Sequence, residues 1–224
     1  MPAKIIVSYD GTANEDDAVA LGRLFADAGA EVSLAYVRHT ADSVGDTQGI
    51  LSRGLALLGD PDIPTHVVTD RSTPEGLAAL AEREQAEVIV FCSDSHTAKG
   101  HVSIGNSAER LLEGGRTAIA IAPVDLAEKT PHVRRVVAVG DGDGGARETA
   151  ESLAAALGAE VVPVAAEDTD VLVLDSRADA PEGRVSLSAS AGHLVEIATS
   201  AVLVLPRGAR LSFGGSRAPQ QTAA

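Results

Sequence analysis

Short apolar segments alternate with amphipathic ones along the first half of the chain. Residues 4–9 form a β-branched run that ends at Asp10, which is typical of a buried strand. Residues 12–28 then change to a helical period, with Thr12 and Glu15 at the spacing of a capping box. Further strands are predicted at 31–37, 65–69, 88–91 and 118–122, and helices at 46–58, from 73 onward and at 105–113. This alternation predicts an α/β fold with a doubly wound parallel sheet and helices on both faces.

The pattern starts again after a polar, linker-like segment. A strand at 135–139 and a helix at 144–157 repeat the first two elements. From residue 88 to residue 123, adding 83 to each position gives twelve identical residues in 36 without a gap, for example Val88 and Val171. Such self-similarity indicates an internal duplication. In the second copy only six residues lie between Val164 and Val171, which is too few for a helix, a strand and a further helix.

The predicted organisation is therefore two doubly wound domains, of which the second is truncated. Residues 1–124 form a complete domain, 125–133 a linker, 134–207 a shortened domain and 208–224 a disordered tail rich in Gly, Ser, Gln and Pro. The apolar runs 118–122 and 202–205 are expected to pair within the chain as an internal pseudo-dimer, because edge strands need cover. The shortened copy leaves an open edge at 161–164, which predicts a further homodimer.

Composition narrows the class of protein. Hydrophobic residues make up 45% of the chain, enough for a packed core, and the net charge of −14 disfavours nucleic acid as a partner. No apolar run is long enough for a membrane span. The start enters a strand at once and leaves no room for a signal peptide. The single cysteine suits a reducing compartment, so a cytoplasmic location is expected.

The segment after the fourth strand carries a motif. Cys92 and Ser95 are followed, after nine further residues, by Gly105 and Asn106 at the start of a predicted helix. In this spacing, and in its order of elements, the chain resembles the universal stress protein family. Members that bind ATP have a loop of pattern G-x-x-G-x9-G-[ST] at this point, so Cys92 and Ser95 stand at the first two glycine positions. The resemblance therefore implies a fold of five βα units and a nucleotide site in the first domain.

The residues of that site follow from the resemblance. It implies an ATP site, with magnesium, formed by Ser8, Asp10, Val37, Cys92, Ser95, Gly105, Asn106 and Ser107. The alternative is a vestigial loop that caps the sheet and binds no cofactor. Glycines in such a loop let the backbone approach phosphates, and a helix start offers free N–H groups. Side chains at Cys92 and Ser95 weaken the site, by roughly 1 kcal/mol at a position that needs positive φ. Thr97, Lys99 and Ser103 remain as further phosphate donors.

The second copy has lost the motif. Asp175, Ala178, Ser188 and Ala189 stand at its four positions, so no motif glycine remains and an acidic residue replaces the first. Nucleotide binding is not expected there.

Other candidate sites are weaker. His96 and His101 have only Asp94 as a nearby helper for a metal, and a solvated loop is the better interpretation. Cys92 is either a redox-sensitive thiol or, more commonly for such a position, a buried cysteine at a strand end. The glycine-rich run 140–145 lacks the Lys and Ser/Thr of a P-loop. No catalytic triad or carboxylate pair can be defined from spacing.

Two classes of function remain. The resemblance implies a non-catalytic stress-response or regulatory protein with at most one weakened adenine-nucleotide site. The alternative is an ATP-binding switch or a slow ATPase that acts through the loop 92–107.

Overall fold

The computed structural model describes residues 1–39, 46–129, 132–140, 144–163 and 168–214. The first half contains β1 (Lys4–Ser8), α1 (Glu15–Asp27), β2 (Glu31–Arg38), α2 (Thr47–Leu58), β3 (Thr65–Thr69), α3 (Thr73–Glu84), β4 (Val88–Cys92), α4 (Asn106–Leu112) and β5 (Ala118–Ala122). The second contains β6 (Arg135–Val139), α5 (Gly145–Leu157), β7 (Glu160–Val162), β8 (Val171–Asp175), α6 (Ala189–Glu196) and β9 (Ala201–Leu205). The predicted α/β class is confirmed.

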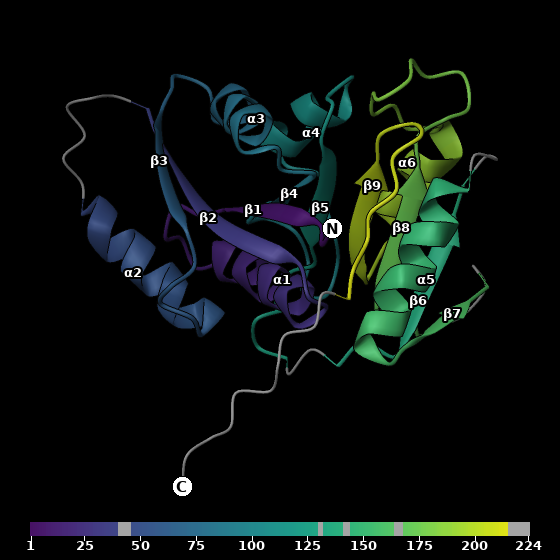
Figure 1. Ribbon diagram of the computed structural model, residues 1–224, viewed down its shortest axis with the longest axis horizontal. Coiled ribbons are helices and arrows are strands. Elements are labelled where there is room, and N and C mark those ends of the chain that lie inside the picture. Colours follow the sequence, from purple (N-terminus) through teal and green to yellow (C-terminus); the bar gives the residue numbers. More distant parts are fainter. Residues whose placement is uncertain (40–45, 130–131, 141–143, 164–167, 215–224) are drawn as a thin grey trace, which may run out of the picture.

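All nine strands of the described chain lie in one sheet, in the order β3-β2-β1-β4-β5-β9-β8-β6-β7 (Figure 1). The first half thus has the doubly wound order β3-β2-β1-β4-β5. Strands within each half are parallel, whereas β5 and β9 pair antiparallel with Ile119 opposite Val204 and Ile121 opposite Val202. These are the two apolar runs that the sequence expects to pair. All five residues of each strand are buried, so the junction between the halves is part of the core.

Helices cover the sheet on both faces. One core cluster joins α1, α2 and α5 to one face, with Phe25 and Leu153 among its buried residues. The other joins α3, α4 and α6 to the opposite face, with Leu80 and Val195 among them. Both clusters run through both halves, so the two copies share one continuous hydrophobic core.

Among the described residues, the second half contributes four of the nine strands. Its strands follow the order β9-β8-β6-β7, and β7 forms the edge of the sheet among the described residues. In the first half the equivalent strand, β2, is covered by β3. Val161 of β7 is 39% exposed. The domain boundaries at 124, 133 and 207 stay a prediction.

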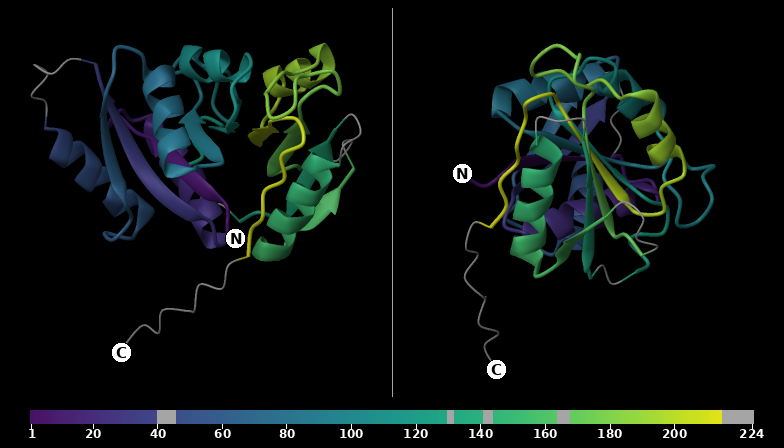
Figure 2. Two further views of the ribbon diagram at one scale, coloured as in Figure 1. Left: turned by 45° about the horizontal axis from the view of Figure 1, so that its top comes forward. Right: turned by 90° about the vertical axis from the view of Figure 1, so that its right-hand side faces the viewer.

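The prediction of a disordered tail from residue 208 is wrong for residues 208–214. Leu211 and Phe213 are buried, and the ring of Phe213 stacks on Phe25 of α1 with 5.7 Å between ring centroids. The amide of Leu211 donates to Thr149 Oγ1 of α5 at 3.0 Å. We call residues 208–214 the strap, because they connect the helices of both halves (Figure 2). Residues 215–224 lie outside the described residues.

The linker is attached to the first half by a buried carboxylate. Asp17 of α1 is 5% exposed and accepts hydrogen bonds from the amides of Asp125 (3.0 Å) and Ala127 (2.8 Å). Burial raises the pKa of Asp17, although these two hydrogen bonds oppose the rise. Residues 125–127 are therefore fixed against α1.

Among the described residues, no helix combines the length and apolar character that a membrane crossing requires.

Candidate functional site

The predicted site residues converge on one pocket. It has a volume of about 280 Å³ and lies at the carboxyl ends of β1 and β4. In the observed sheet order the chain leaves β1 and β4 in opposite directions, and open α/β sheets bind ligands at such a switch point. All eight predicted residues line it, namely Ser8, Asp10, Val37, Cys92, Ser95, Gly105, Asn106 and Ser107. The other lining residues are Tyr9, Asn14, Glu15, His39, Thr73, Phe91, Ser93, Asp94 and Ala108.

Ser93 closes the base of the motif loop. Its side chain is 2% exposed, donates to the carbonyl of Ala122 at the end of β5 (2.6 Å) and accepts from the amide of Ser103 (3.1 Å). The Ser103 hydroxyl in turn accepts from the amide of Asp94 at 3.1 Å. Thr97 and Ser103 also bond to each other through their hydroxyls. The hydroxyls of Thr97 and Ser103, predicted as phosphate donors, therefore hold the loop together, and neither residue lines the pocket.

Neither substituted glycine position is strained. Among the described residues, only Gln85 and Asp125 combine a side chain with positive φ. The strain predicted for Cys92 and Ser95 is therefore absent, and any loss of affinity comes from the volume of their side chains. Gly105 also has an ordinary backbone, with φ −74° and ψ 160°, and an added Cβ would meet no heavy atom within 4 Å. Glycine is thus not required there for folding.

The thiol of Cys92 is held inside the pocket. Asn14 Nδ2 donates to Cys92 Sγ at 3.3 Å. Burial, together with the negative charges of Glu15 and Asp10, raises the pKa of Cys92 to about 12. A thiol with such a pKa stays protonated at neutral pH and reacts slowly, which favours the buried strand-end cysteine over a redox sensor.

A pair of carboxyl groups lies at the start of α1. The predicted capping box is wrong, because α1 begins at Glu15 and the Glu15 carboxyl accepts from the amide of Asp10. Burial and, next to it, the adjacent Asp10 carboxylate raise the pKa of Glu15 to about 9. Burial also raises the pKa of Asp10, but hydrogen bonds from Glu15 and Thr12 outweigh it and leave that pKa below its usual value. At neutral pH the pair therefore carries one proton, on Glu15, and one negative charge.

Sequence reasoning missed Glu15 as a pocket residue. The spacing from Thr12 to Glu15 predicted a capping box, in which the Glu15 side chain bonds to the start of its own helix. The signal that could have found it is an acidic residue in the loop that follows the first strand. In open α/β sheets this loop borders the ligand crevice.

Lys99 does not contribute to the pocket. Its ammonium group forms ion pairs with Asp125 (2.9 Å) and Glu128 (3.8 Å) instead. No lysine or arginine of the described chain lines the pocket, and its acidic lining residues are Asp10, Glu15 and Asp94. An anionic ligand would thus need a counter-cation.

The described residues of the second half do not form an equivalent pocket. A hollow of about 510 Å³ lies at the ends of β6 and β8, but of the four motif positions only Asp175 lines it. The Asp175 side chain is 8% exposed and lies against Gly140. Positions 141–143 of the glycine-rich run lie outside the described residues.

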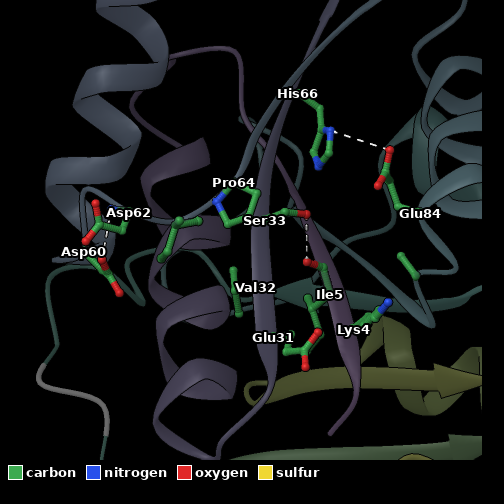
Figure 3. A pocket seen from close by; sticks show the side chains of 12 residues that line it. Lys4, Ile5, Glu31, Val32, Ser33, Asp60, Asp62, Pro64, His66 and Glu84 are labelled. Atoms are coloured by element: carbon green, nitrogen blue, oxygen red, sulfur yellow. Dashed lines mark hydrogen bonds and ion pairs between the residues drawn. The ribbon is translucent and has the colours of Figure 1, made fainter. Parts of the chain in front are cut away.

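Another hollow, of about 410 Å³, lies at the amino ends of β1 and β2 (Figure 3). His66 faces Glu84 across it at 3.9 Å. Its other ionisable lining residues are Lys4, Glu31, Asp60 and Asp62. None of the predicted site residues lies in it, so it is separate from the pocket of the motif loop.

Comparisons with known proteins agree with this fold. No family model and no curated protein matches the sequence. Among solved structures, a universal stress protein from Archaeoglobus fulgidus is similar with a TM-score of 0.66 and 13% identity, over 92% of this chain and 98% of that one. A protein of unknown function from Pseudomonas aeruginosa is similar with a TM-score of 0.65 and 13% identity, over 92% of this chain and 93% of that one. The chain therefore has the fold of the universal stress proteins.

Proposed function

We propose that this chain is a cytoplasmic, non-catalytic regulatory protein of the universal stress type, with one weakened adenine-nucleotide site in its first half. The observation that carries the proposal is the convergence of all eight predicted site residues on one pocket at the switch point of the sheet. In this pocket Ser8 and Val37 would face the adenine. Ser95, Asn106 and Ser107 would face the phosphates.

The charge of the pocket supports ATP bound together with magnesium. Its lining includes the ionised Asp10 and no lysine or arginine of the described chain, so a bare triphosphate would be repelled. A divalent cation neutralises part of the phosphate charge. Protonation of Glu15 also lowers the negative charge that the ligand meets.

A nucleotide-dependent switch or slow ATPase is the second candidate. The observation that favours a switch is the attachment of the motif loop to the second half through a backbone hydrogen bond from Val102 to Ala198 (3.0 Å). The slow ATPase would be supported if the protein releases phosphate from ATP and if mutation of pocket residues stops this release.

Restoring glycine at the two substituted motif positions tests the site. The double change Cys92→Gly and Ser95→Gly should tighten binding of magnesium-ATP by about 1 kcal/mol, or roughly fivefold, because it removes side-chain volume without relieving backbone strain. Titration calorimetry measures both affinities. No binding to the double variant at millimolar ATP would make the pocket vestigial, and the protein would be better described as a structural or partner-binding protein of this fold.

We also propose that two copies of the chain associate through the open edge at β7. This edge has no neighbouring strand in the described chain, and Val161 is 39% exposed beside a hollow lined by Ala138, Val162 and Pro163. A second copy related by a two-fold axis would give β7 a partner.

Light scattering at high micromolar concentration should then show a homodimer. Val161→Lys should shift the protein to monomer, because a charged side chain on an edge strand opposes pairing. Val67→Lys on the opposite edge, β3, is the matched control and should leave the dimer intact. A strict monomer in the unmodified protein would contradict the dimer, whereas the pairing of β5 with β9 would be unaffected.

A further inference from the structure

The motif loop of the first half reaches across the junction into the second half. The amide of Val102 donates to the carbonyl of Ala198, between α6 and β9, at 3.0 Å. Val102 is 3% exposed and Ala198 is 7% exposed, and both belong to the core cluster shared by the two halves. The loop that borders the pocket is therefore held partly by residues outside its own half.

The same contact occurs in the opposite direction. Adding 83 to Val102 and to Gly115 gives Val185 and Ala198. The amide of Val185 donates to the carbonyl of Gly115 at 2.8 Å, so the two halves exchange equivalent hydrogen bonds across their local two-fold axis. The second-half loop has lost its motif residues but has kept this contact.

Val102 is close to the pocket along the chain. Three residues after it, Gly105 begins the run Gly105, Asn106, Ser107 and Ala108 that lines the pocket. On its other side, Gly100 and His101 are tied to Val124, through bonds of 2.9 Å from the Gly100 amide and 3.0 Å to the His101 carbonyl. The junction thus holds the middle of a loop whose two ends line the pocket.

We propose that the shortened second half acts as a positioning partner for the first-half pocket, with Ala198 holding the motif loop through Val102. The expected effect on nucleotide affinity rests on the proposed nucleotide site. The contact that holds the loop does not depend on any ligand. This contact gives the second copy a role, although the second copy has no motif of its own. Ala198 is a positioning residue, since it touches the loop and not the pocket.

The test enlarges the side chain of Ala198, the second-half residue that contacts the motif loop. Ala198→Leu adds three carbon atoms at the junction, and overpacking of this kind costs about 1–3 kcal/mol locally. The matched control is Ala191→Leu on α6, a position that is also 7% exposed and whose amide bonds to Ser188 in its own half. Hydrogen exchange of the ligand-free protein and calorimetry with magnesium-ATP are measured on both variants.

Ala198→Leu should speed exchange of the Val102 amide about tenfold or more and weaken magnesium-ATP about tenfold. Ala191→Leu should change either value by no more than about twofold. Equal effects of the two variants, or normal exchange at Val102 in Ala198→Leu, would overturn the proposal. If exchange changes as expected but the unmodified protein binds no ATP, the positioning role stands and the nucleotide site fails.

A milder pair of variants covers the case in which Ala198→Leu does not fold. Val102→Ala and Val185→Ala remove the same two methyl groups from the two equivalent loops, at residues that are 3% and 0% exposed. Only Val102→Ala should speed exchange of the Gly100 amide, which lies in the pocket loop. Faster exchange at Gly100 in both variants would overturn the proposal.

Discussion

Replacing Phe213 with alanine should lower the free energy of unfolding by about 3 kcal/mol, the lower end of the usual range for a buried phenylalanine. Phe213 is 8% exposed and stacks on Phe25, and its amide donates to Ser152 Oγ at 2.8 Å. Its contacts therefore join α1 of the first half to α5 of the second. For a chain of this length the midpoint of thermal unfolding should fall by roughly 6–12 °C.

Thermal and urea unfolding measure this loss. Leu57→Ala is the control, because Leu57 is 38% exposed and its truncation should cost well under half as much. Removal of residues 215–224 alone should leave the midpoint unchanged, while removal of residues 208–224 should lower it as Phe213→Ala does. A loss below about 0.5 kcal/mol for Phe213→Ala would mean that the strap is not docked in solution.

The sequence was informative where periodicity determines structure. Strands such as 88–91 and 118–122 are short, β-branched and fully apolar, so both their type and their burial in a parallel sheet could be predicted. The offset of 83 residues also holds in the structure, where Ser93 and Ser176 make equivalent bonds to Ala122 and Leu205. A duplicated sequence thus predicts duplicated contacts.

The strap could not be predicted in the same way. It contains two glycines and one serine in seven residues, and Leu211 and Phe213 indicate that one side is apolar. Two apolar residues two positions apart have no partner visible in the local sequence. The groove that receives them is formed by α1 and α5, which are far apart in the chain. Long-range packing of this kind overrides what local composition indicates.

The candidate site could likewise be predicted only in part. Motif spacing predicted which backbone positions meet, because a loop of fixed length between β4 and α4 must return to the same end of the sheet. It did not predict where flexible side chains point. Lys99 pairs with Asp125 and does not line the pocket, and Glu15 bonds to the amide of Asp10.

Gly105→Asp should abolish nucleotide binding and leave the fold intact. The backbone of Gly105 is in the extended region, and a Cβ there has free space, so the new side chain fits without strain. Aspartate is also a good residue at the start of a helix, and stability should rise by roughly a few tenths of a kcal/mol. In the pocket, however, the added charge faces the phosphates beside Asp10 and Asp94. Repulsion of about 3 kcal/mol or more is expected at such distances, which is over a hundredfold in affinity.

Ser188→Asp provides the matched control for this change. Adding 83 to Gly105 gives Ser188, which begins α6 and already accepts from the amide of Ala191 at 3.2 Å. Aspartate can make the same bond, so the charge is added at the equivalent place in the half without the motif, and magnesium-ATP affinity should stay within about twofold of the unmodified protein. Equal losses in both variants would indicate a general effect of charge. Unchanged affinity in Gly105→Asp would place the nucleotide somewhere other than the pocket at β1 and β4, because that pocket cannot hold phosphates against three carboxylates.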